Sequence, residues 1–135
     1  LVIAVPSGWI DVDNIYDLIE LSYEYKGRSE NLKLATKYPN LVRRKLENYD
    51  VHNIVLVSAS GGLEAAPIIG YADIIADITV TGKTMKENNL KPLKDGVLFN
   101  SQACVITSNS IPKDLNIEFL NIIKKLKSVG KSENI

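Results

Sequence analysis

Short apolar runs alternate with longer amphipathic stretches along most of the chain. Five runs rich in Val, Ile and Leu predict strands, at Leu1–Val5, Leu32–Thr36, Asn53–Val57, Ile74–Thr79 and Val97–Thr107. The stretches between and after them predict helices, at about Asn14–Tyr25, Pro39–Asn48, Gly62–Gly70, Lys83–Asn88 and Asp114–Ser128. This alternation with short connections predicts an α/β fold, with a mostly parallel sheet flanked by helices.

Composition narrows the class of protein. A chain of 135 residues fits one ordinary domain, and 45% hydrophobic with 24% charged residues is typical of a globular protein rather than a disordered or coiled-coil one. Sixteen basic residues balance sixteen acidic ones, which argues against a protein that grips nucleic acid along its length. No apolar run approaches the roughly 20 residues of a membrane span. The single cysteine, Cys104, excludes an internal disulfide framework and indicates a reducing, cytoplasmic compartment.

The most informative segment joins an apolar strand to a turn rich in hydroxyl groups. Asp77 ends the strand, and Thr79-Val80-Thr81-Gly82-Lys83-Thr84 opens the next predicted helix. Backbone N–H groups at a helix start attract anions, and glycine lets a phosphate approach the backbone closely. Asp77 is then placed to accept hydrogen bonds from sugar hydroxyls. On the pattern alone, this interpretation and a simple threonine N-cap with a turn glycine fit equally well.

The Gly82-Lys83-Thr84 sequence does not belong to a nucleoside-triphosphatase loop. That motif requires a glycine five positions before its G-K-[ST], and this position holds Asp77, whose carboxylate would repel triphosphate oxygens.

Several other polar residues have simpler explanations on the pattern alone. Gly62 and Glu64 follow a strand in Ser60-Gly61-Gly62-Leu63-Glu64 and fit a flexible turn better than a second phosphate site. Lys37, Arg43 and Arg44 are typical of a solvated basic helix face. Asp13, in Asp11-Val12-Asp13, is predicted to cap the helix that follows rather than to bind a metal. We expect His52 to have no catalytic role. Cys104 is predicted to be a small buried side chain. We expect no metal site formed by protein side chains.

Four segments together resemble a known family. Ala35-Thr36-Lys37-Tyr38-Pro39-Asn40-Leu41-Val42-Arg43 resembles the A-T-K-Y-P-N-L-x-R segment of ATP phosphoribosyltransferase, the first enzyme of histidine biosynthesis. Gly62–Pro67, Gly70–Asp77 and Thr81–Met85 resemble its G-x-V-E-x-A-P, G-L-A-D-x-I-x-D and T-G-x-T-L signatures. The match runs in order from Leu1 to about Thr107. Tyr71 and Met85 replace the usual leucines, and neither change removes a polar site group.

The resemblance implies transfer of phosphoribosyl from phosphoribosyl pyrophosphate to N1 of ATP, with release of pyrophosphate and help from substrate-bound Mg²⁺. It places the 5-phosphate in Thr79–Thr84 and the ribose on Asp77. It also raises Glu64, Asp73, Lys37 and Gly62 to candidates for the substrate cleft. It indicates no protein nucleophile.

The family's catalytic region has two lobes and resembles periplasmic solute-binding proteins of type II. The resemblance therefore implies that residues 1–107 form the second, phosphoribosyl-binding lobe. Residues 108–129 are expected to form a helix that returns to a first lobe absent from this chain, and 130–135 a flexible tail. We expect the chain to be a piece of a longer protein, inactive alone, that forms a homo-oligomer and works with a separate regulatory subunit. The alternative is a non-enzymatic lobe of a solute-binding or effector-binding protein, which shares this architecture.

Overall fold

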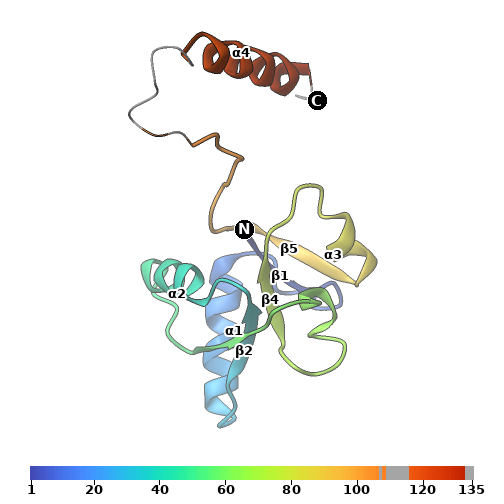
Figure 1. Ribbon diagram of the computed structural model, residues 1–135. Helices are drawn as coiled ribbons and strands as arrows, with labels where there is room; N and C mark the ends of the chain where they lie inside the picture. Colours follow the sequence, from blue (N-terminus) through green and yellow to red (C-terminus); the bar gives the residue numbers. More distant parts are fainter. Residues whose placement is uncertain (107, 109–115, 133–135) are drawn as a thin grey trace. The chain divides into compact units, whose positions relative to one another are not determined.

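The computed structural model describes residues 1–106, 108 and 116–132, and the chain divides into two compact units, Leu1–Ser101 and Gln102–Ile135. The first unit contains a five-stranded sheet in the order β3-β2-β4-β1-β5 (Figure 1). Its strands are β1 (Val2–Pro6), β2 (Leu32–Thr36), β3 (Ile54–Ser58), β4 (Ile74–Asp77) and β5 (Leu90–Val97). The α/β class predicted from the sequence is confirmed.

The sheet is mixed. β2, β3, β4 and β5 run in one direction and β1 lies antiparallel between β4 and β5, so the predicted direction holds for four of these five strands. The departure from it lies at the first connection. The helix α1 (Ile15–Gly27) begins beside β5, where the Ile15 N–H donates to Asp95 Oδ1 at 2.8 Å, and its Tyr25 shares a hollow with Lys33 of β2. The helix thus carries the chain across β1 and β4 to β2. β2 begins at the end of the sheet where β1 finishes, so the two strands run in opposite directions.

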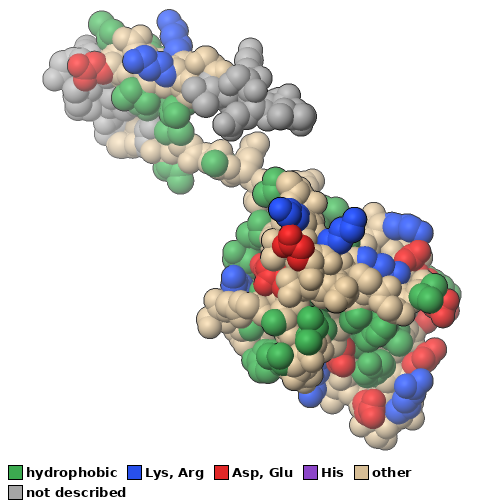
Figure 2. Space-filling view, turned by 90° about the vertical axis from the view of Figure 1, so that its right-hand side faces the viewer, with side chains coloured by type: hydrophobic (Ala, Val, Ile, Leu, Met, Phe, Trp, Pro, Cys, Tyr) green, Lys and Arg blue, Asp and Glu red, His purple; other side chains and the backbone are tan. Residues whose placement is uncertain are grey.

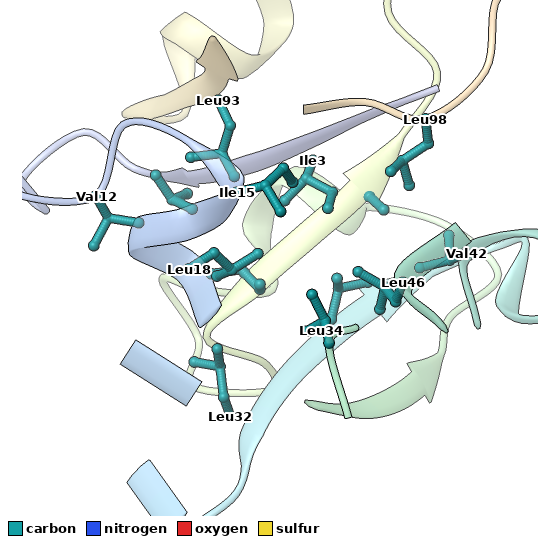
Figure 3. Packing of buried hydrophobic residues seen from close by; sticks show 14 of the residues in the cluster. Ile3, Val12, Ile15, Leu18, Leu32, Leu34, Val42, Leu46, Leu93 and Leu98 are labelled. Carbon is teal, nitrogen blue, oxygen red and sulfur yellow. The ribbon is translucent and has the colours of Figure 1, made fainter. Parts of the chain in front are cut away.

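Side chains alternate between the two faces of the sheet and build two apolar clusters. On one face, strand residues such as Ile3, Leu34 and Ile74 pack with Leu18 of α1 and Leu46 of the helix α2 (Pro39–Asn48), as Figure 3 shows for several of them. The other face is covered by the segment that contains Leu63 and by the short helix α3 (Lys83–Glu87). This period of two in the strands is what lets one sheet bury both faces.

The helices start where their local sequence directs them. Asn14 caps α1, because its Oδ1 accepts from the Asp17 N–H at 3.1 Å while Asp17 Oδ2 accepts from the Asn14 N–H at 3.1 Å. The prediction that Asp13 is the cap was therefore wrong by one residue. Pro39 begins α2, where its missing N–H and restricted φ cost nothing, so that helix has the predicted bounds.

Two predicted elements are absent from the described chain. The strand predicted at Val97–Thr107 does not form, since residues 98–106 have no regular structure, and Thr107 lies outside the described residues. Its place at the sheet edge is taken by β5, which contains Pro92 and the buried Gly96. An edge strand tolerates proline, and the glycine accompanies a register shift against β1.

The helix predicted at Gly62–Gly70 shrinks to a single 3₁₀ turn, η1 (Leu63–Ala65), followed by further turns. Pro67 has no N–H to donate, and Gly70 adopts a φ of +71°, which ends any helical path.

The second unit contains the helix α4 (Asn116–Ser132). It confirms most of the helix predicted at Asp114–Ser128, although residues 114 and 115 lie outside the described part. The helix continues to Ser132, so the flexible tail predicted for residues 130–135 is wrong for residues 130–132, and residues 133–135 lie outside the described part. The compact lobe itself ends at Ser101, before the predicted boundary at 107.

Candidate functional site

The turns that follow β2, β3 and β4, which contain Lys37, Gly62 and Thr79–Thr84, lie at one end of these strands. Because β2, β3 and β4 are parallel, with Thr36 paired to Ser58 and to Ala76, their carboxyl ends lie side by side. A backbone hydrogen bond of 3.2 Å from the Ala59 N–H to the Thr36 carbonyl ties two of the turns together. In sheets of this kind, ligands bind beyond the carboxyl ends of the strands.

Asp77 is a buried acidic residue at this edge. It ends the central strand β4, and only 9% of its surface is exposed. Its Oδ1 accepts a hydrogen bond of 2.8 Å from the N–H of its neighbour Ile78. No protein donor in the described chain reaches Oδ2, and no cation pairs with the carboxylate. Burying a carboxylate costs free energy unless donors satisfy it, so Asp77 is suited to receive hydroxyl or metal ligands from a bound molecule.

The turn after Asp77 is held by its own threonines. The Gly82 N–H donates to Thr79 Oγ1 at 2.8 Å, and the Lys83 N–H donates to Thr81 Oγ1 at 3.3 Å. Gly82 has a φ of +69° and precedes α3 as its N-cap residue. The alternative of a threonine N-cap is therefore wrong, because no side chain caps this helix.

The helix α3 has only five residues, so its dipole contributes less to anion binding than the sequence pattern suggested. The groups that the turn presents to a ligand are its backbone N–H groups. Thr79 and Gly82 are half-buried, and the other residues of the turn are exposed. Val80 is 96% exposed, and Lys83 lies 3.9 Å from Glu87 in an exposed pair that leaves it free to turn toward an anion.

The turn after β3 forms one wall of a hollow of about 330 Å³ at the same edge. Gly62 lies in its lining with a φ of +61°, and Glu64 is half-buried on η1 next to it. Tyr71 donates a hydrogen bond of 3.0 Å from its hydroxyl to the Ser58 carbonyl and so shapes the opposite wall. The sequence pattern did not single out Tyr71, because a tyrosine in a turn carries no spacing signal.

The structure separates two of the remaining cleft candidates. Lys37 is exposed directly after β2, at the same edge as Asp77. Asp73 lies at the other end of β4, about 13 Å away by strand rise. Its Oδ2 accepts a 2.7 Å hydrogen bond from the Lys33 N–H, which ties down the start of β2. Asp73 and Asp77 are thus four residues apart in sequence and lie at opposite ends of strand β4.

The other polar residues noted in the sequence lie away from this edge or in the solvent. Asp13, just before α1, forms ion pairs with two lysines of β5, at 2.6 Å to Lys91 Nζ and 2.8 Å to Lys94 Nζ. Hydrogen bonds from these two lysines lower the pKa of Asp13 from 3.8 to about 2. His52 pairs with Asp50 at 2.7 Å in the solvent. Cys104 is exposed in an irregular segment, so the expectation of a buried thiol was wrong.

A larger hollow, of about 490 Å³, lies between α1 and the loop before it and is remote from the carboxyl edge. Its wall combines Trp9 and Tyr25 with acidic residues of α1 that have internal partners, such as Asp17 and Glu24. The carboxyl edge, where Asp77 Oδ1 accepts from the Ile78 N–H and Oδ2 has no protein donor in the described chain, is the stronger candidate.

Two features are absent from the described part of the chain, a cluster of metal ligands and a membrane-spanning helix. Within residues 1–106, 108 and 116–132, no group of three or more His, Cys, Asp or Glu side chains is placed to hold a metal ion. No helix in the same part of the chain is long and apolar enough to cross a membrane. On the lobe face that Figure 2 shows, acidic and basic side chains are interspersed rather than gathered by sign.

The five-stranded sheet and the helices that cover it define an α/β lobe. Comparison with known proteins identifies the family. The family model of HisG, ATP phosphoribosyltransferase, matches residues 1–128. The chain is 42% identical over 108 residues to an ATP phosphoribosyltransferase of Rhizobium etli and 35% identical over 130 residues to that of Agrobacterium fabrum. The chain therefore belongs to the ATP phosphoribosyltransferase family, as the sequence resemblance predicted.

The relatives are longer than this chain. The alignments cover 78% and 95% of the chain but only 47% and 56% of these two proteins, so the chain spans about half the length of the relatives it matches. Among solved structures, the ATP phosphoribosyl transferase (HisG:HisZ) complex from Thermotoga maritima is similar, with a TM-score of 0.53 and 33% identity. That match covers 72% of this chain and 39% of the other. The structure thus matches part of a larger catalytic protein.

Proposed function

We propose that this chain supplies the phosphoribosyl-binding lobe of an enzyme that transfers phosphoribosyl from phosphoribosyl pyrophosphate to N1 of ATP. The observation that supports it most directly is Asp77, a buried carboxylate with one oxygen free of protein donors, next to a turn of backbone N–H groups. Family membership supplies the reaction, which opens histidine biosynthesis. In this proposal the turn at Thr79–Thr84 takes the 5-phosphate, and Asp77 takes the ribose hydroxyls.

In the reaction, a bond forms between N1 of ATP and C1 of the ribose while the bond from C1 to pyrophosphate breaks. Positive charge develops on the ribose and negative charge on the leaving group. Nothing on the carboxyl edge needs to act as a covalent nucleophile, so the task of the lobe is to hold the sugar in position. The carboxylate of Asp77 is also placed to favour the positive charge on the ribose.

In this proposal, Mg²⁺ reaches the site as an ion carried by the substrate. The described residues offer no cluster of three ligands, whereas Mg²⁺ bound to phosphates keeps several waters and needs one or two carboxylates. When bound, Mg²⁺ would neutralise the leaving pyrophosphate. Asp77 and Glu64 are the carboxylates at this edge that are available to orient it.

The partners of the lobe follow from the length of the relatives. We propose that residues outside these 135 complete the ATP site, and that the whole protein assembles as a homo-oligomer with a separate regulatory subunit in the cytoplasm. The similar solved structure is a complex of two proteins, HisG and HisZ, which supports an assembly of this kind.

The test compares two aspartates on the same strand. Asp77→Asn keeps the shape of the side chain but removes its charge, so we expect at least tenfold weaker binding of Mg²⁺–phosphoribosyl pyrophosphate by titration calorimetry. Asp73→Asn is the matched control, because Asp73 lies at the opposite edge and we expect wild-type affinity. Equal affinities in wild type and Asp77→Asn would contradict the placement of the ribose, and thermal unfolding would show that both variants fold.

A further inference from the structure

The strand β3 leaves one side of its backbone without a strand partner in the described chain. It lies at one edge of the sheet and pairs with β2 on its inner side (Figure 1). The Ala59 N–H donates to the Thr36 carbonyl, and the backbone groups of successive residues point to alternate sides of a strand. The N–H and C=O groups of Ile54 and Leu56 therefore point away from β2, as does the N–H of Ser58. A row of such groups is a template for a further strand.

The two edges of the sheet differ in how they are protected against such pairing. β5, at the other edge, contains Lys91, Pro92 and Lys94 and has a register shift against β1. Charged residues, proline and bulges are the features that discourage pairing between edge strands. β3 has none of them, since its sequence is Ile-Val-Leu-Val-Ser, and Val55 in it is 43% exposed. The composition of β3 is therefore that of a strand with neighbours on both sides.

The helix beside this edge carries two opposite charges that form no ion pair in the described part of the chain. Arg43 and Glu47 are exposed and lie one turn apart on α2. They line a small hollow of about 90 Å³ together with Ile54 and Leu56 of β3, so they lie on the side of the helix next to the edge. A surface with both charges is complementary to a second copy of itself, provided that the two helices meet antiparallel.

We propose that β3 is a contact between two copies of this chain, which pair antiparallel about a twofold axis at Leu56 and join their sheets into one. Leu56 then faces Leu56 of the second copy, and Ile54 faces Ser58 of the second copy. These pairs exchange N–H···O=C hydrogen bonds through the groups that point away from β2. On the other face of the sheet, Val55 packs against Val57 of the second copy.

The same axis brings the two α2 helices together. Leu46 of α2 packs in the cluster that contains Leu34 of β2 and Leu56 of β3, so each helix covers its own edge of the joined sheet. With neighbouring strands about 4.8 Å apart, the two helix axes lie about 10 Å apart, the distance of packed helices. They run antiparallel, which places Arg43 of each copy beside Glu47 of the other.

This inference goes beyond the proposed function, because it needs no ligand. It assigns to one surface the contact between copies that the proposed homo-oligomer requires, and that surface lies within these 135 residues.

Charge reversal tests the twofold contact. Arg43→Glu and Glu47→Arg each place like charges opposite one another across the axis, and the symmetry repeats the effect twice. We expect the wild-type chain to form a reversible dimer in sedimentation equilibrium, and each single variant to raise the dissociation constant at least tenfold. An equimolar mixture of the two variants restores opposite charges at both crossings, so we expect wild-type affinity there. Lys26→Glu is the matched control, an equal change of charge at an exposed position of α1, and should dimerise as the wild type does.

Amide hydrogen exchange, followed by NMR, locates the contact on the strand. The Leu56 N–H points away from β2, whereas the Val55 N–H points toward it. We expect the exchange of the Leu56 amide to slow at least tenfold when the protein concentration rises from well below the dissociation constant to well above it. The Val55 amide should change little over the same range.

Three results would overturn the proposal. A wild-type chain that stays monomeric at about 1 mM, the weak limit of specific association, would leave this edge to a segment outside the 135 residues. A dimer that both single variants leave unchanged, or in which the Leu56 amide gains no protection, would place the contact on another surface. Thermal unfolding shows that each variant is folded. None of these results bears on the phosphoribosyl site, which the titration of the aspartate variants tests separately.

Discussion

Replacing Gly82 by alanine separates the backbone role of this glycine from its role in binding. Gly82 has a φ of +69°, a conformation that residues with a side chain adopt only at a cost. The position of an added Cβ is open, with no atom within 4 Å, so the methyl group meets no clash in the ligand-free lobe. Strain alone therefore determines the loss of stability, and the methyl group would occupy the space that a bound phosphate needs.

The magnitude follows from the left-handed backbone. Holding an alanine there costs about 1–2 kcal/mol. For a unit of about 100 residues, 1 kcal/mol corresponds to a fall in Tm of roughly 4–8 °C. Gly70 is the matched control, because its φ is +71° and its Cβ position is equally open, yet it lies in the turns before β4 and outside the candidate site.

The assay measures thermal unfolding and the affinity for ribose 5-phosphate in both variants. We expect Gly82→Ala and Gly70→Ala to lose similar stability, and only Gly82→Ala to lose affinity, by tenfold or more. Unchanged affinity in Gly82→Ala would show that the ligand does not approach this amide. A loss of stability much larger in Gly82→Ala than in Gly70→Ala would refute the reasoning from strain and open space.

Three further predictions concern the core, the pH dependence and the activity. Leu34→Ala empties a fully buried position against Leu46 (Figure 3) and should cost about 2–5 kcal/mol in urea unfolding, whereas Leu41→Ala, on the exposed side of α2, should stay within about 0.5 kcal/mol. The lowered pKa of Asp13 means that its pairing with two lysines stabilises the fold above its ordinary pKa of 3.8 and is lost as the pH falls toward 2. Thermal unfolding from pH 6 to 2 should therefore show a difference between wild type and Asp13→Asn that is constant above about pH 5 and shrinks below it; a constant difference throughout would contradict the pairing. Finally, a steady-state assay should detect no phosphoribosyl transfer by the 135-residue chain alone, and turnover would show that the lobe holds a complete site.

Local sequence was sufficient to predict the bounds of a helix or strand wherever a few neighbouring residues determine where it begins and ends. β2 and α2 have the predicted bounds, because the apolar run at Leu32–Thr36 can only be a buried strand and Pro39 can begin a helix but not continue one. The link between Asp77 and the turn after it was also predictable, since residues adjacent in sequence stay adjacent in space. The motifs of the turn identified the family for the same reason: they lie within short, continuous segments.

Tertiary structure decided what depends on partners distant in the chain. The antiparallel direction of β1 follows from the course of α1 across the sheet, which no local pattern specifies. β5 forms in spite of Pro92 and Gly96 because β1 offers it backbone partners, whereas residues 98–106 have no regular structure although they are more apolar. Sequence by itself determined which segments are apolar, where helices begin and which residues meet in a turn, because these depend on near neighbours. Strand direction and strand pairing required the folded chain, because hydrogen bonds between distant segments decide them.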